Sequence, residues 1–177
     1  FVEQFKVLVS QLRSGDPKND ATSIAPMARA DLRATLHDQV ERSLAAGAKL
    51  VTGGTFTGTQ GAYYAPAILD HVQPGMPAFD EELFGPVAAI VRVKNAEDAI
   101  KLANQTDFGL GGSVWTSNAA RGEALARKIH AGCVFVNGIV KSDPRLPFGG
   151  IKDSGYGREL SYHGIREFMN IKTVWIK

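Results

Sequence analysis

The sequence predicts an α/β fold built on an open parallel sheet of the doubly wound type. The main observation is an alternation of short apolar runs, which suit buried strands, with amphipathic stretches, which suit helices. Residues 87–139 follow the order strand–helix–strand–helix–strand, which implies parallel neighbours joined by right-handed crossovers. The composition agrees, because 44% hydrophobic and 21% charged residues among 177 are ordinary for a globular protein with a substantial core.

Two helices are expected before the first strand. One spans residues 1–13, carries apolar side chains on one face, and ends at the turn cluster SGDP. Because the chain starts at phenylalanine inside this helix, we expect it to be a piece of a longer protein. The other helix spans residues 26–46, and Gly47 follows where a left-handed helix stop belongs. Its apolar stripe recurs every fourth residue and consists of Leu32, Leu36, Val40 and Leu44.

The remaining elements follow in order along the chain. Asn95 can cap a helix, with Asp98 three positions on and an apolar stripe behind it. The glycine-rich segment LPFGGIKDSGYG reads as a loop. The strands are expected at residues 48–54, 63–69, 87–93, 112–116, 133–139 and 170–177, and the later helices from 96, over 118–130 and over about 158–169.

Several classes of function are disfavoured by composition. A net charge of +2 is too small to predict a nucleic-acid partner, and no apolar run approaches the roughly 20 residues of a membrane span. The four histidines have no metal-ligand spacing, so we expect no metal site. One cysteine cannot form an internal disulfide, which favours a reducing compartment and hence a cytoplasmic location.

That single cysteine, Cys133, could be a nucleophile or a small apolar residue filling a core. A nucleophilic thiol needs a base, a cation or a helix N-terminus beside it. His130 is three residues away but ends a helix, and Cys133 itself opens an apolar strand. Free cysteine is among the most buried residue types, so the pattern favours the core role.

The segment DEELFGP, residues 80–86, also allows two interpretations. It can be a solvated acidic turn before a buried strand, which the spacing alone favours. It can instead offer one carboxylate to vicinal hydroxyls, as acidic residues do for ribose, with the neighbouring aromatic ring packed on a flat ligand. The glycine-rich segments do not match the standard phosphate-binding patterns.

Four motifs in order resemble the aldehyde dehydrogenase superfamily over essentially the whole chain: EELFGPV, NQTDFGLGGSVWT, AGCVFVN and PFGGIKDSGYGRE. Within it, IAPMARADLR and VKSDPRLPFGG are most similar to bacterial NAD(P)-dependent succinate-semialdehyde dehydrogenases. The resemblance implies an aldehyde dehydrogenase type of open parallel-sheet catalytic domain over residues 1–169. It also implies an oligomerisation strand over residues 170–177, and therefore a homo-oligomer, either dimer or tetramer.

The resemblance implies that neither catalytic group is present. In this family the nucleophilic cysteine and the general-base glutamate lie in segments upstream of residue 1, so Cys133 is not the nucleophile and the chain alone is expected to be inactive. The cofactor would be NAD or NADP, chosen by a domain that this sequence does not include. The alternative is a non-catalytic dimerisation or nucleotide-binding domain, which the coding sequence upstream of Phe1 would distinguish.

Site residues are carried over by motif. Glu82 matches the glutamate that holds the nicotinamide-side ribose, and Phe84 the aromatic near the nicotinamide. Phe148 matches an aromatic of the aldehyde pocket, and Ser142 lies where the family sets substrate fit. The expected substrate-binding set is completed by the loop cations Lys141 and Arg145. These two would suit a distal carboxylate, such as that of succinate semialdehyde, unless both are solvated or Arg145 pairs with Asp143.

Overall fold

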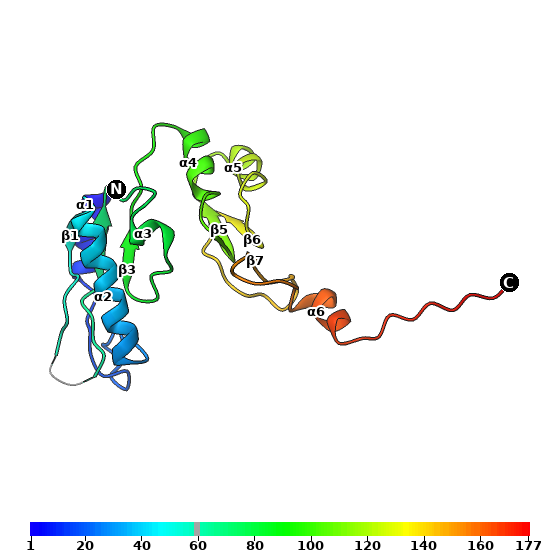
Figure 1. Cartoon of the computed structure of the whole chain (residues 1–177), viewed down its shortest axis with the longest axis horizontal. Coiled ribbons are helices and arrows are strands. Elements are labelled where there is room, and N and C mark those ends of the chain that lie inside the picture. The colour runs from blue at the N-terminus through cyan, green and yellow to red at the C-terminus, as the bar shows by residue number, and fades with distance from the viewer. Residues whose placement is uncertain (59–60) are drawn as a thin grey trace. The chain divides into compact units, whose positions relative to one another are not determined.

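The computed structural model describes residues 1–58 and 61–177, which form two compact units, Phe1–Arg92 and Val93–Lys177. Figure 1 labels their helices and strands in chain order. No helix in the described ranges is long and apolar enough to cross a membrane.

The first unit combines helices with a small mixed sheet of order β1-β2-β3. β1 and β2 are antiparallel, whereas β2 and β3 are parallel, with Ala67 opposite Val87. The elements are α1 (Val2–Ser10), α2 (Ala30–Ala45), β1 (Lys49–Thr52), β2 (Ala67–Asp70), α3 (Pro77–Asp80) and β3 (Val87–Ala89).

The core of this unit forms where α2 packs beside β2 and α3. All four residues of β2 are buried, as are Leu36 and Val40 from the predicted stripe of α2. Full burial of each of the larger aliphatic side chains in this core, such as Leu36, Val40 and Ile68, stabilises the fold by about 1.5–3 kcal/mol. The stripe is therefore confirmed, and so is the helix stop, because Gly47 has a φ of +108°.

The second unit is built around a parallel pair, β5 and β6, in which Gly111 lies opposite Cys133 and Val114 opposite Val136. β4 and β7 form a separate antiparallel pair. The predicted Asn95 cap is confirmed, since its side chain accepts a 2.8 Å hydrogen bond from the backbone N–H of Asp98. The elements are α4 (Ala96–Ala103), β4 (Phe108–Gly109), β5 (Gly111–Val114), α5 (Ala119–Ala126), β6 (Cys133–Val136), β7 (Ile151–Lys152) and α6 (Ser161–Glu167).

The predicted α/β class with parallel strands is confirmed, but the strand–helix–strand–helix–strand run does not form one sheet. β3 pairs with β2 in the first unit, while β5 and β6 pair in the second. The helix expected over residues 118–130 ends at Ala126, after which i→i+3 bonds such as that from Lys128 N to Leu125 O tighten the chain. The helix expected from 158 begins at Ser161, because Glu159 is held extended by two backbone hydrogen bonds to Phe148.

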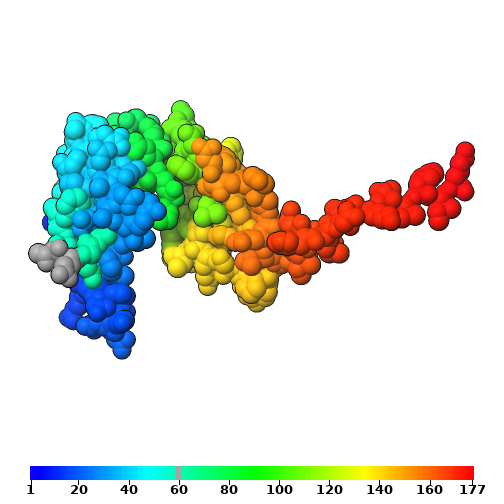
Figure 2. All heavy atoms as spheres, turned by 60° about the horizontal axis from the view of Figure 1, so that its bottom comes forward, coloured from blue at the N-terminus to red at the C-terminus, as the bar shows by residue number. Residues whose placement is uncertain are grey.

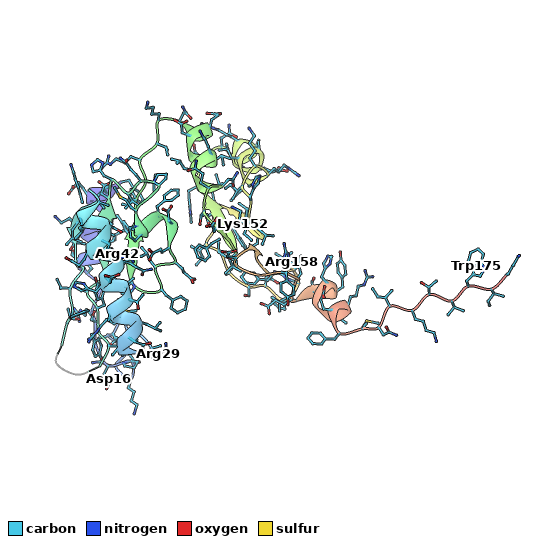
Figure 3. The ribbon with its side chains drawn as sticks, viewed as in Figure 1. Asp16, Arg29, Arg42, Lys152, Arg158 and Trp175 are labelled. Carbon is cyan, nitrogen blue, oxygen red and sulfur yellow. The ribbon has the colours of Figure 1, made fainter. Side chains whose placement is uncertain are left out.

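The segment expected as a closing strand has no assigned helix or strand in the structure. In Figure 1 it follows α6 as an extended trace, and its apolar side chains are open to solvent, with Trp175 84% exposed. Figure 2 shows its atoms as a narrow strip, and Figure 3 shows the Trp175 ring directed away from the trace. A strand exists only when paired, so residues 170–177 would need a partner strand to become one.

Candidate functional site

The two adjacent carboxylates at residues 81 and 82, after α3, have different surroundings. Glu81 accepts two hydrogen bonds from the Arg42 guanidinium, at 2.8 and 2.9 Å, and one from the Gln39 amide at 3.0 Å. These bonds from Arg42, and then from Gln39, lower the pKa of Glu81 to about 2. The Glu82 side chain is exposed, and its backbone oxygen accepts a 3.1 Å bond from Gln39. Glu82, the residue that the sequence pointed to, is thus the carboxylate of the pair that is open to a ligand.

An apolar groove of about 280 Å³ begins beside this loop. Phe84, which is 66% exposed, lines it together with Leu83. From the other side come Met27 and Leu32, from the start of α2 and the segment before it. An open carboxylate next to an exposed ring and an apolar groove can hold hydroxyl groups at one point and a flat ring at another.

The sequence-predicted substrate residues lie in the second unit, and two of them line one pocket. This pocket of about 410 Å³ is lined by Lys141, Asp143 and Phe148, together with Cys133 and the other residues of β6. Ser142 is exposed on the same loop and does not line the pocket. Because the Asp143 carboxylate is already engaged by Arg145, Lys141 is the cation of this lining that can face an anionic group, and the pocket can accommodate a short chain that ends in a carboxylate.

Arg145 does not itself line this pocket, but it is paired with Asp143, which does. Its Nε and Nη2 donate to the two carboxylate oxygens at 2.9 and 2.6 Å, and its backbone N–H donates to one of them. The guanidinium holds the pKa of Asp143 well below its usual range. Of the two alternatives for Arg145, the structure thus shows the ion pair with Asp143. Lys141 has no carboxylate within 4 Å in the described part of the chain.

Backbone contacts set the position of Phe148. Its N–H and C=O bond to Glu159 at 2.9 and 2.8 Å. Gly149 follows, and its carbonyl oxygen lies so close to Gly132 that a Cβ added there would sit 1.6 Å from it. Only glycine at position 132 allows this approach, which joins the pocket loop to the start of β6.

Cys133 lacks the surroundings of an activated thiol. It is half-buried, and its Sγ donates a long 3.5 Å contact to the carbonyl of Leu110. Burial raises the pKa of the thiol, opposed by the more distant charge of Arg158. A raised pKa lowers the thiolate fraction at neutral pH, which argues against a nucleophile. No group of three or more potential metal ligands gathers in the described residues.

The family model described as "Aldehyde dehydrogenase family" matches residues 1–174. The chain belongs to the aldehyde dehydrogenase family. The resemblance carried by the four motifs is thereby confirmed.

The relatives within the aldehyde dehydrogenase family also confirm the finer resemblance. The chain is 48% identical over 175 residues to the succinate semialdehyde dehydrogenase [NAD(P)+] Sad of Escherichia coli, covering 99% of this chain and 38% of the relative. It is 49% identical over 176 residues to a probable succinate-semialdehyde dehydrogenase [NADP(+)] of Synechocystis, covering 99% and 39%.

Solved aldehyde dehydrogenases share the fold. The crystal structure of succinic semialdehyde dehydrogenase from Streptococcus pyogenes, in complex with NADP+, superposes with a TM-score of 0.93 at 39% identity, covering 99% of this chain and 39% of that one. The structure described as giving insights into cofactor and substrate selection by Gox0499 superposes with a TM-score of 0.95 at 40% identity, covering 99% and 39%. The chain thus spans well under half the length of the family members that it matches.

The residues that sequence reasoning missed in this family member are those that hold the site loops. Gln39 is only 5% exposed, and Arg42 lies one turn further along α2, where Figure 3 labels it. A glutamine directly before buried Val40, at the edge of an apolar stripe, is the signal that could have marked Gln39. The contact partners lie about 40 residues away, so no local pattern reveals them.

Proposed function

We propose that the complete protein containing this chain is an NAD(P)-dependent succinate-semialdehyde dehydrogenase, which oxidises succinate semialdehyde to succinate. The observation that carries this proposal is 48–49% identity, over 99% of the chain, to relatives with that name. The pocket that Lys141 and Phe148 share gives independent support, because it combines a cation with an apolar wall and the carboxylate in its lining, that of Asp143, is paired with Arg145.

Glu82 and Phe84 are proposed to position the nicotinamide end of the cofactor. The supporting observation is that the Glu82 carboxylate is open while that of Glu81 is engaged, and that the exposed Phe84 ring begins an apolar groove. A carboxylate accepts strong hydrogen bonds from vicinal ribose hydroxyls, and an aromatic face packs on a flat ring. The bound cofactor would supply the hydride acceptor; the chain's own residues would orient it.

Phe148 is proposed as the apolar wall of the aldehyde pocket, and Ser142, on the same loop, as a residue that sets substrate fit. Lys141 is proposed to attract the distal carboxylate of succinate semialdehyde, since it lines the pocket. Arg145 takes a secondary role here, because its guanidinium is already occupied by Asp143. Its proposed contribution is to hold the loop and add to the positive potential around the pocket.

The 177-residue chain by itself is proposed to be inactive, with Cys133 taking no covalent part. The raised pKa of its thiol supports this assignment. Residues 170–177 are proposed to form an oligomerisation strand in a dimer or tetramer, supported by the exposed apolar side chains of the segment. A reducing, cytoplasmic location is proposed from the single free cysteine.

The test is to purify the complete protein and follow reduced cofactor at 340 nm with succinate semialdehyde and either NAD+ or NADP+. The proposal expects aldehyde-dependent reduction by the complete protein, none by residues 1–177 alone, and unchanged turnover in Cys133→Ser. Loss of turnover in Cys133→Ser would restore that residue as the nucleophile. A complete protein that binds the dinucleotide but reduces none with any aldehyde would instead support a non-catalytic nucleotide-binding or dimerisation domain.

A further inference from the structure

We propose that Gln39 and Arg42 of α2 are positioning residues that engage Glu81 and fix the backbone of Glu82, so that Glu82 alone is offered to the ribose of a nicotinamide dinucleotide. This inference rests on the proposed cofactor role of Glu82 and concerns how that role is assigned between two adjacent carboxylates. Figure 3 marks Arg42 on the helix that supplies both residues.

Two adjacent glutamates are chemically equivalent ligands for a pair of hydroxyls. In a loop free to turn, either carboxylate could face the ligand, and one of the two backbone arrangements would misplace the neighbouring Phe84. The structure removes this ambiguity through side chains of another element. Arg42 donates Nη1 and Nη2 to the two oxygens of Glu81, a bidentate geometry that fixes the plane of the carboxylate.

Gln39 joins the two glutamates through a single amide nitrogen. Its Nε2 donates to Oε2 of Glu81 at 3.0 Å and to the backbone oxygen of Glu82 at 3.1 Å, so both of its protons are used. Gln39 is 5% exposed, and a buried amide without such partners would carry an unfavourable desolvation free energy. The amide therefore holds the Glu82–Leu83 peptide and the Glu81 carboxylate in one relative arrangement.

Gln39 is in turn connected to α3 through the side chain of Ser43. The Ser43 hydroxyl donates to the backbone oxygen of Gln39 at 2.7 Å and accepts from the N–H of Ala78 at 2.9 Å. Ala78 lies in α3, three residues before Glu81, and both Ser43 and Ala78 are buried. α2 is thus bonded to both ends of the short segment that leads to Glu82.

The charges agree with this division of roles. Arg42 bonds Asp38 as well as Glu81, so each of its three guanidinium nitrogens donates to one of those two carboxylates. Glu82 has no cation within 4 Å in the described residues, and its charge remains available to hydroxyl donors. The same helix thereby engages one carboxylate of the pair and leaves the other open.

The test measures dissociation constants in the complete protein for two probes: the nicotinamide dinucleotide that supports turnover, and its adenosine half alone, AMP or adenosine 2′,5′-bisphosphate. Gln39→Leu and Arg42→Met should each raise the dissociation constant of the dinucleotide by about fivefold or more, the size of one hydrogen bond. The dissociation constant of the adenosine half should stay within about twofold of the wild-type value. A purely structural loss would weaken both probes alike. Asp38→Asn is the matched control, because it removes a partner of Arg42 but spares Glu81, and it should change neither constant.

Glu82→Gln distinguishes a failure of the cofactor role of Glu82 from a failure of the positioning role of Gln39 and Arg42. If Glu82→Gln raises the dissociation constant of the dinucleotide alone while Gln39→Leu and Arg42→Met leave that constant unchanged, the positioning role is overturned. The cofactor role of Glu82 then stands. If Glu82→Gln changes neither constant, the cofactor role itself fails, and the positioning role with it. Equal weakening of both probes by Arg42→Met, whose guanidinium is partly exposed and whose loss should leave the fold intact, would also overturn the inference.

Discussion

Replacing Asp70 by asparagine should destabilise the chain, because this carboxylate ends the buried strand β2 and is held by three donors. Its side chain is 8% exposed and accepts bonds from Arg92 Nε at 3.0 Å and Nη2 at 2.6 Å, and from the backbone N–H of His71 at 2.7 Å. Arg92, followed by His71, lowers the pKa of Asp70 from 3.8 to about 2. That shift corresponds to at most about 2 kcal/mol of stability, since Arg92 is half exposed and solvent screens the pair.

The pH dependence of this contribution has a defined sign. Because the pKa is lower in the folded chain, the stabilisation is fully present above about pH 4 and is lost as the pH falls toward 2. Denaturant unfolding of the chain, followed by circular dichroism at pH 7, 5 and 3, should therefore show the penalty of Asp70→Asn shrinking at the lowest pH. Glu123→Gln, which breaks the exposed pair with Arg127, is the control and should change stability little. A loss of stability at pH 7 no larger than that of the control, or a loss that grows on acidification, would show that the Arg92–Asp70 pair does not stabilise the fold.

Three further predictions concern the second unit. Gly132→Ala should lower the free energy of unfolding by about 2 kcal/mol or more, because the added Cβ would meet the Gly149 carbonyl oxygen at 1.6 Å. Gly138→Ala is the control and should be tolerated, because the nearest atom to its added Cβ is 3.8 Å away. Equal thermal midpoints for the two variants would contradict this prediction. Arg145→Met should leave the aldehyde KM of the complete protein within about threefold, since its guanidinium bonds Asp143; a tenfold rise specific to carboxylate-bearing aldehydes would reverse the assignment. Deleting residues 170–177 should lower the oligomeric mass of the complete protein in light scattering, and an unchanged mass would show that this segment is not the assembly strand.

The sequence predicted those helices and caps that are determined by residues close together in the chain. The stripe of α2 follows from apolar residues four apart, and the cap at Asn95 from a side chain three residues from its partner. The parallel pairing of β5 with β6 was expected because a helix separates the two runs, although the register that sets Gly111 opposite Cys133 was not. In each case the information lies within about 20 residues of sequence.

What the sequence could not show depends on pairings between distant segments. The extended run from Val87 was expected to join the later strands, yet it pairs with Ala67, because register is decided by which buried strand edges meet. Charge spacing alone left Arg145 undecided between a ligand and Asp143, and the bidentate geometry resolves it. Glu81 and Glu82 are adjacent residues of one motif, and the motif does not show which carboxylate is engaged. That is decided in part by Gln39 of α2, which bonds the Glu81 carboxylate and the backbone oxygen of Glu82.

The proposed function assigns to this chain the wall of the aldehyde pocket in a succinate-semialdehyde dehydrogenase, with Lys141 as the cation that selects the substrate carboxylate. The most direct measurement is kcat/KM of the complete protein for succinate semialdehyde relative to butanal, an uncharged aldehyde with the same number of carbon atoms, in wild type, Lys141→Met and Arg145→Met. We expect Lys141→Met to lower the preference for succinate semialdehyde by about tenfold or more, the size of one charge-assisted hydrogen bond, and Arg145→Met to change it far less. Equal losses for both aldehydes in Lys141→Met, or a wild type without preference, would contradict it.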